Sequence, residues 1–514
     1  MPGSKGQEKP IAVHATVLLD KGGHKFPARY IFAILAFVGL FNSYALHVDL
    51  SVAIVAMVKA RTINTTTLNA SEIHQREDSC PYPNASRSNN NVLEHTAGEF
   101  EWDGTTQGIV LGSYFYGYIL TQFPGGWVAN RFGAKYVLGL ALLTSGLLSL
   151  VLPVLTRWNL WALIVVRFLQ GFVGGVSFPC VHAMCGKWIP PSERTMLSMF
   201  IYSGTHFGTV CTLIISGVLT EHLGWDSVFY VFGSLACVWF VLWLFFAYNS
   251  PEEHPRISAT EKAFLMAVIG NRFSHSDGRP QNIPWSRIAR SLPFYAICVA
   301  FFGQDWGFFT LLTNLPSYLA RVLHFRMEQN GFIAAVPYLA LGLLMPVLGI
   351  VADKLINSRT LSRTAVRRTY HLIGQLSAAG CLIAVTLVGC NVVATVILLI
   401  CAVGMLAFSV ASFAINHIDI APQYAGILMG ITNTIGAVPG IVAPYLVGVL
   451  TSGPDGNTLT QWSIVFYVTA GIFIVCGIFY ACCASGELQP WDEPKKAQDP
   501  PKPNSSSICL TRDF

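Results

Sequence analysis

Charged residues are scarce in this chain. Asp, Glu, Lys and Arg make up 11% of its 514 residues, where an ordinary globular protein carries about 25%. Hydrophobic residues make up 53%, so the chain has too little polar surface to cover itself in water. The scarcity of charge therefore excludes an ordinary water-soluble fold and makes lipid the expected solvent. The basic residues form no patch that indicates nucleic-acid binding, and the inner-face loops that carry them are expected to face the lipid bilayer.

The sequence also lacks the patterns of catalytic and metal sites. Most of the 13 cysteines lie in apolar runs, where cysteine behaves as a small hydrophobic residue. No Cys/His spacing matches a metal site, and no nucleophile stands with a base and an orienting partner. We therefore expect no enzyme activity, no metal and no cofactor. Cys80 stands alone in a polar loop, where it either keeps a free thiol or bonds to another outer loop.

Long apolar runs, in contrast, are abundant. About twelve of them have roughly the 20 residues that cross a bilayer as a helix. The predicted spans are 30–58, 104–128, 136–155, 160–185, 196–219, 227–248, 293–320, 330–352, 370–390, 392–414, 425–450 and 463–484. Because no cleavage site precedes the first run, we expect it to remain as a helix. The predicted fold class is an all-α membrane protein of twelve transmembrane helices.

The two halves of the chain repeat each other in order. Trp225-Asp-Ser-Val-Phe-Tyr-Val returns as Trp462-Ser-Ile-Val-Phe-Tyr-Val, and the loop string Gly125…Lys135 returns, loosened, as Gly349…Lys354. Duplicated membrane bundles around a central site are typical of transporters. The expected parts are an N-terminal tail (1–28), a six-helix bundle (29–248), a central linker (249–292), a second six-helix bundle (293–484) and a disordered tail (485–514).

The distribution of Lys and Arg predicts the orientation. These residues gather in alternate loops, which the positive-inside rule places in the cytosol together with the linker and both termini. The intervening loop 59–103 is then outside, and it carries the glycosylation sequons of Asn64, Asn69 and Asn84. The sequence leaves the plasma membrane and the endolysosomal or vesicular membrane both open.

Ionisable residues inside the spans are costly in lipid, so each is a functional candidate. Arg167 keeps its charge and needs an anion, which is either a protein carboxylate such as Asp49 or the substrate. We favour the substrate. Asp305, near the middle of the seventh span, either carries a proton or sodium ion or only packs as a hydrogen-bonded acid. The weaker candidates are His182 and His206.

The loop that follows the second span is a candidate gate. Its paired glycines permit a tight helix end, and its basic residues can bond exposed helix carbonyls on the cytosolic face, which suits a latch between two helices. The plainer alternative is a basic loop that only anchors the topology. Partial repetition in the second half favours the latch. The candidate gate residues are Gly125, Gly126, Arg131, Gly133, Lys135 and Asp353.

Several strings carry a resemblance to a known family. They are Tyr44-Ala-Leu-His-Val-Asp-Leu-Ser-Val-Ala53, Gly112-Ser-Tyr-Phe-Tyr-Gly-Tyr118, Trp188-Ile-Pro-Pro-Ser-Glu-Arg194, Ile415-Asn-His-Ile-Asp-Ile-Ala-Pro422 and Tyr424-Ala-Gly-Ile-Leu-Met-Gly-Ile-Thr-Asn433. With the two-times-six layout, they make the chain resemble the major facilitator superfamily. Within it, the chain is similar to the anion:cation symporters, which include sialin, the vesicular glutamate transporters and the sodium–phosphate cotransporters, and sialin-like members look nearest.

The resemblance implies anion transport by alternating access around a central arginine-lined site. Arg167 matches the family arginine of the fourth span. The implied substrate-binding residues are Arg167, His47, Tyr44, Tyr116, Tyr202 and Gln304. Our own hypothesis is that cation coupling has moved from the fourth span to Asp49 or Asp305, where sialin has amides.

Departures from the family pattern narrow the expectation. His47 and Gln304 stand where relatives have arginines, and Gln170 and Gly174 stand where sialin has glutamates. These differences argue against a vesicular glutamate carrier. We expect a symporter of phosphate, sialic acid or another carboxylate, coupled to Na⁺ or H⁺. A non-transporting anion sensor on the same fold is the alternative.

Overall fold

The computed structural model describes residues 26–58, 80, 98–102, 104–269, 283–323, 327–451 and 458–492. Asn64, Asn69 and Asn84 lie outside the described residues, so glycosylation stays a prediction. The first six spans are formed by α1 (Ala28–Met57), α2 (Gly104–Phe132), α3 (Ala134–Trp158), α4 (Leu160–Gly174) with α5 (Ser177–Trp188), α6 (Arg194–Leu223) and α7 (Asp226–Phe246). The last six are α10 (Leu292–Arg321), α11 (Met327–Asn357), α12 (Arg363–Val388), α13 (Val392–Ile420), α14 (Ala425–Thr451) and α15 (Leu459–Cys483).

The predicted spans all coincide with long helices. Among the described residues, eleven stretches are long and apolar enough to cross a membrane. The twelfth predicted span is α2, which has 29 residues but is diluted by Gly, Ser, Thr and Gln. It packs against α4 and α14, and its Ser113, Thr121 and Gln122 side chains are buried while Ile109, Leu120 and Phe123 are exposed on its other face.

Local sequence accounts for the breaks between helices. Gly389, with a φ of 57°, ends α12 in a conformation that residues with a Cβ rarely adopt. The side chain of Asn391 then caps α13 by accepting a hydrogen bond from the backbone N–H of Ala394 at 3.1 Å. The fourth span breaks near Gly175, where a Cβ would collide with Thr121 of α2.

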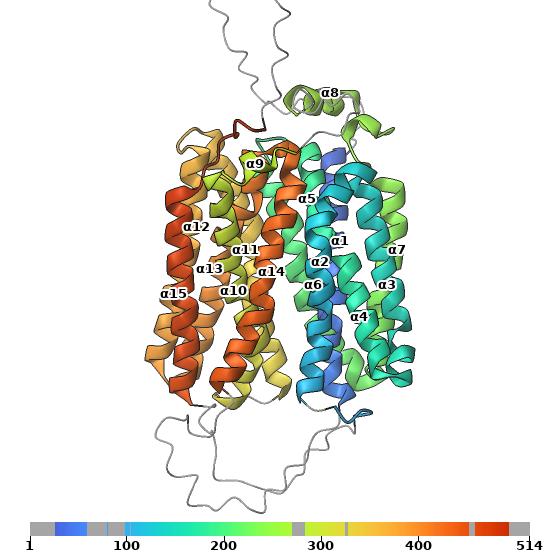
Figure 1. Cartoon of the computed structure of the whole chain (residues 1–514), viewed down its shortest axis with the longest axis vertical. Helices are drawn as coiled ribbons and strands as arrows, with labels where there is room; N and C mark the ends of the chain where they lie inside the picture. The colour runs from blue at the N-terminus through green and yellow to red at the C-terminus, as the bar shows by residue number, and fades with distance from the viewer. Residues whose placement is uncertain are drawn as a thin grey trace, which may run out of the picture.

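The two halves stand side by side, with α1–α7 on one side and α10–α15 on the other (Figure 1). Two short helices between them, α8 (Ala259–Val268) and α9 (Trp285–Ile288), lie at one end of the bundle. The halves meet along two equivalent lines, since α2 packs on α14 and α6 packs on α11. Each line pairs the second span of one half with the fifth span of the other, as expected for a duplicated unit.

Glycines allow the helices to approach closely along these lines. A Cβ on Gly126 or Gly430 would collide with the backbone of the facing helix, and a Cβ on Gly349 would lie 2.8 Å from Cα of Met196. Small residues permit such backbone contact in membranes. Gly217 differs, because a Cβ there would meet nothing within 4 Å. The glycines are therefore needed only where the halves or neighbouring helices touch.

Candidate functional site

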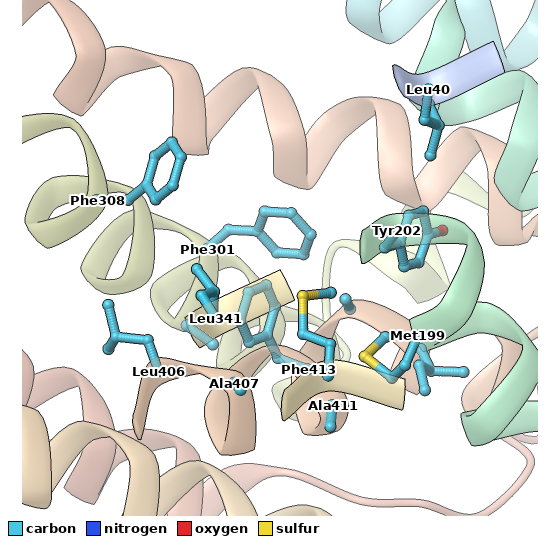
Figure 2. Packing of buried hydrophobic residues seen from close by; sticks show 14 of the residues in the cluster. Leu40, Met199, Tyr202, Phe301, Phe308, Leu341, Leu406, Ala407, Ala411 and Phe413 are labelled. Atoms are coloured by element: carbon cyan, nitrogen blue, oxygen red, sulfur yellow. The ribbon is translucent and has the colours of Figure 1, made fainter. Parts of the chain in front are cut away.

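A cavity of about 100 Å³ lies between the two halves. Its walls come from α1, α2, α5 and α6 in the first half and from α10, α11, α13 and α14 in the second. Figure 2 shows the packed residues around it, with Phe301 between Phe308 and Tyr202 and with Phe413 beneath Phe301 in this view. The aromatic lining residues are Tyr44, Tyr118, Phe178, Tyr202, Phe301, Phe308, Phe309 and Phe413.

The polar part of the lining is small. It consists of the side chains of Thr205, His206, Gln304, Asp305 and Asn433, together with the tyrosine hydroxyls. Among the lining residues that the structure describes, Asp305 is the only acid and none is Lys or Arg. In this conformation the cavity is therefore an aromatic chamber with one carboxylate.

Arg167 lies outside this lining. Its side chain is 1% exposed, and its guanidinium pairs with the Asp49 carboxylate at 3.2 Å. It also donates to the carbonyl oxygens of Leu46 at 3.2 Å and His47 at 3.0 Å, and to Oε1 of Gln170 at 3.0 Å. The structure thus brings Arg167 and Asp49 together as an internal ion pair, the alternative that we had favoured less, because burial of either charge alone in lipid is costly.

Other predicted binding residues divide into two groups. Tyr44, Tyr202 and Gln304 line the cavity. His47 does not reach the lining, because its ring stacks on Tyr114 with centroids 4.2 Å apart.

Tyr116 requires a correction. It is 54% exposed and does not belong to the lining, whereas Tyr118 does. Residues two apart on a helix point in nearly opposite directions, so only one of the two can face the cavity. The stacked pair Tyr114–Tyr118, with centroids 5.8 Å apart, shows the helical spacing that could have identified the inner face.

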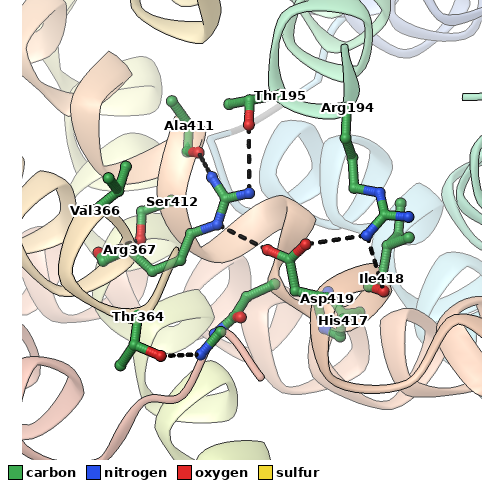
Figure 3. Close-up of polar contacts among 12 residues, drawn as sticks. Arg194, Thr195, Thr364, Val366, Arg367, Ala411, Ser412, His417, Ile418 and Asp419 are labelled. Atoms are coloured by element: carbon green, nitrogen blue, oxygen red, sulfur yellow. Dashed lines mark hydrogen bonds and ion pairs between the residues drawn. The ribbon is translucent and has the colours of Figure 1, made fainter. Parts of the chain in front are cut away.

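A polar cluster closes the end of the bundle where α6 begins (Figure 3). Asp419 accepts from Arg194 at 3.1 Å and from Arg367 at 2.9 Å, and Arg367 also donates to the Thr195 hydroxyl at 3.3 Å. Arg194 and Thr195 belong to the first half, and the other two residues belong to the second. All four side chains are nearly fully buried. The cluster is therefore a buried ionic bridge between the halves.

Asp353 adds a second closure at the same end. Its carboxylate accepts from the backbone N–H groups of Thr195 at 3.1 Å and Met196 at 2.7 Å. It thereby satisfies free donors in the first turn of α6 and complements the positive end of that helix. Asp353, in the second-half copy of the loop motif, thus joins α11 to α6 of the other half.

The first-half copy behaves differently. Arg131 is exposed and stacks over Trp127 at 5.5 Å, rather than bonding helix carbonyls as predicted. Lys135 places its ammonium over Tyr248 at 4.6 Å, inside its own half. Asn130 stands where the second copy has Asp353, and without the carboxylate there is no charge to cap the facing helix.

The paired glycines and the turn of this first copy serve packing. Gly125 approaches Val176 of the fourth span, and Gly126 approaches the start of α14. Gly133, with a φ of 89°, makes the turn into α3. The latch role of Arg131 and Lys135 stays a prediction, and in this conformation both side chains lie over aromatic rings of their own half.

A disulfide joins Cys80 to Cys390 across a sequence separation of 310 residues. Cys80 lies between α1 and α2, and Cys390 lies between α12 and α13. The bond therefore links the two halves at the end of the bundle opposite the polar cluster. Of the two alternatives open for Cys80, the structure shows the bond to another loop.

The sequence profile of the Major Facilitator Superfamily matches residues 84–444. The chain belongs to this superfamily. It is 42% identical to human sialin over 464 residues, covering 90% of each chain. It is 38% identical to a putative inorganic phosphate cotransporter of Drosophila melanogaster over 480 residues, covering 93% of this chain and 88% of the relative. The predicted relationship is thereby confirmed.

The fold agrees with that of solved superfamily members. The structure of the proton:xylose symporter XylE matches 89% of this chain and 97% of its own, with a TM-score of 0.63 and 13% sequence identity. At that identity the likeness establishes the fold alone. It confirms the predicted fold of two six-helix repeats.

Proposed function

We propose that this protein is a secondary active symporter of a small anion, driven by Na⁺ or H⁺ and working by alternating access. The observation that carries the proposal is the central cavity, which takes its walls from both halves and is closed at one end by the Asp419 and Asp353 contacts. Release of these contacts would let the halves rock and open the cavity to the cytosol. The names of its relatives, sialin and the phosphate cotransporter, support an anionic substrate.

The charge of the cavity supports coupling to a cation. Asp305 faces the space without Lys or Arg among the described lining residues, so its ionised form would repel an entering anion. A proton or sodium ion on the carboxylate removes that repulsion. Anion and cation then bind favourably only together, which is the requirement for symport. Asp305 is therefore our coupling residue.

Asp49 and Arg167 play another part in this proposal. Asp49 accepts from Arg167, from the Leu50 N–H at 2.6 Å and from the Ser149 hydroxyl at 3.4 Å. An anion reaches Arg167 only if it displaces this carboxylate in a later step of the cycle. In the closed state the Asp49–Arg167 pair fixes α1 against α4. Tyr44 and His47 lie on the same helix, α1, so the pair also fixes their position relative to the cavity wall.

The disulfide supports the orientation. Disulfides persist in oxidising compartments, so the Cys80–Cys390 end faces the exterior or a lumen, and the polar cluster and both termini face the cytosol. Both the plasma membrane and an endolysosomal or vesicular membrane satisfy this condition.

Uptake into proteoliposomes tests the proposal. Labelled phosphate and labelled sialic acid are offered with a sodium gradient or a pH gradient imposed separately. We expect one gradient to drive uptake of an anion and Asp305→Asn to abolish that dependence, whereas the exposed linker change Glu252→Gln leaves uptake intact. Binding of an anion without flux under either gradient, in folded protein, would favour the sensor alternative.

A further inference from the structure

The central cavity has two polar poles that the protein itself does not satisfy. Asp305, on α10, has no hydrogen bond or ion pair with the described residues, although it lines the cavity. His206, on α6, is 8% exposed, and its Nδ1 has no partner among the described residues. Buried polar groups in proteins are nearly always paired. Both residues line the cavity, and they come from opposite halves of the molecule.

The surroundings of Asp305 suit a positively charged group. Phe301, Asp305, Phe308 and Phe309 line the cavity together, at the spacing of one helix face. The carboxylate and the Phe301 ring both lie against Gly436, where a Cβ would collide with the carboxylate. A carboxylate among aromatic faces is the arrangement that binds organic ammonium groups, through charge pairing and cation–π attraction.

The positions of Asp305 and His206 are related through Phe308, which lines the cavity with them. The His206 ring lies edge-on to Phe308 with centroids 5.8 Å apart. Phe308 is three residues from Asp305, about 4.5 Å along the helix axis at 1.5 Å per residue. The imidazole thus lies against an aromatic residue that is one helical turn from Asp305. A ligand that reached both would carry an apolar body over that ring.

The same lining is poorly suited to free phosphate. Proteins bind phosphate through Arg and Lys side chains or clustered backbone N–H groups. Among the described lining residues there is no Arg or Lys. Most of them lie inside long helices, whose N–H groups are already bonded, and Phe178 lies in the first turn of α5.

We propose that the cavity binds a zwitterion, namely an amino acid with an apolar side chain, whose ammonium contacts Asp305 and whose carboxylate points to His206. The inference goes beyond the proposed function, because it adds a second class of ligand, without net charge, to the same cavity. It also has a consequence for coupling. The ammonium of a zwitterion supplies the positive charge that Asp305 requires, so it competes with Na⁺ or H⁺. An anion without an ammonium needs that cation instead.

Binding measurements on the full chain in lipid nanodiscs test the inference with two matched probes, L-phenylalanine and N-acetyl-L-phenylalanine. The second lacks the ammonium and keeps the carboxylate and ring. We expect L-phenylalanine to bind about tenfold more tightly, and Asp305→Asn to bring the ratio near one. Raising sodium at constant ionic strength, or lowering the pH, should weaken binding of L-phenylalanine and strengthen binding of the acetylated probe.

A second variant tests the other pole. His206→Asn should weaken L-phenylalanine several-fold and leave phenethylamine, which has no carboxylate, unchanged. Glu252→Gln is the control for both variants, and thermal unfolding verifies that each is folded. Equal or tighter binding of the acetylated probe to the wild type, or an unchanged ratio in Asp305→Asn, overturns the inference.

The failure of the inference and the failure of the proposed function are distinguishable in the same preparation. In one outcome, a gradient drives uptake of the acetylated probe or of phosphate while binding shows no selectivity for the ammonium. That result supports the symporter proposal and overturns the proposal of a zwitterionic ligand. Selective binding of L-phenylalanine with no flux under any gradient keeps the zwitterion and overturns the symporter.

Discussion

Two carboxylates inside the bundle, Asp49 in the first half and Asp305 in the second, have opposite surroundings. Asp49 is 0% exposed and is neutralised by Arg167 at 3.2 Å. Asp305 faces an aromatic cavity without a protein cation among the described lining residues. The same residue type at comparable depth thus belongs once to the scaffold and once to the site. The comparison teaches that an acid within the membrane identifies a functional position only when its partner is missing.

The loop motif shows the same contrast at the end of the bundle. The second-half copy carries Asp353, which caps α6 across the interface between the halves. The first-half copy carries Asn130, and its Lys135 turns back to Tyr248 of its own half. Duplication therefore left two similar loops, of which one provides an ionic contact and the other provides close packing at Gly126.

Removal of Asp49 should have the largest effect. Asp49→Ala leaves the Arg167 guanidinium buried without its counter-charge, so we expect a loss of about 3–5 kcal/mol in stability. Asp305→Ala should cost less than about 1 kcal/mol, because no partner is left behind. Thermal unfolding of the purified protein measures both. The double change Asp49→Leu with Arg167→Met should recover most of the loss. Equal destabilisation by Asp49→Ala and Asp305→Ala would remove the distinction between the two acids.

Removal of Asp419 should open the closed end. Asp419→Ala leaves Arg194 and Arg367 facing each other without the carboxylate, which penalises only the conformation that brings them together. We expect the open conformation to gain at least tenfold in population. The readout is modification of Cys185, which is buried in the closed state, by a maleimide added from the cytosolic side and mapped by mass spectrometry. Unchanged labelling would mean that the ionic bridge does not hold the gate.

The smallest effect is expected from the difference between Asn130 and Asp353 in the two copies of the loop motif. Asn130→Asp places a carboxylate near the start of α14, as Asp353 does at the start of α6. We expect it to stabilise the closed state by about 0.3–1 kcal/mol, and Asp353→Asn to destabilise it by about 1 kcal/mol. Cys185 labelling should fall in the first variant and rise in the second. A rise in both would show that the two loops are not equivalent in position.

The fold was largely predictable from the sequence because the patterns that determine it extend over many residues. Runs of some 20 apolar residues and a repeated order of motifs fix spans and duplication, and even the uncertain break before α13 follows from Gly389 and the Asn391 cap. A search by composition alone would miss α2 as a membrane span, because its polar residues are covered by neighbouring helices rather than by lipid.

The site was predictable only in part. Tyr44, Tyr202, Gln304 and Asp305 were placed correctly at the cavity. Tyr118 and Asn433, whose amide donates to the Tyr118 hydroxyl at 3.0 Å, were missed, because the inner face of a helix with aromatic residues all round depends on its neighbours.

The disulfide between Cys80 and Cys390 makes the transporter a covalent ring. The peptide chain joins the halves through the segment between α7 and α10, and the disulfide joins them again at the opposite end. A cut in the central segment therefore leaves one molecule until the disulfide is reduced, and two afterwards. Each half is held at both ends, so it can rock about the cavity but cannot drift away from its partner. Movement at one end is limited by the disulfide, and movement at the other end requires that the ion pairs of Asp419 separate.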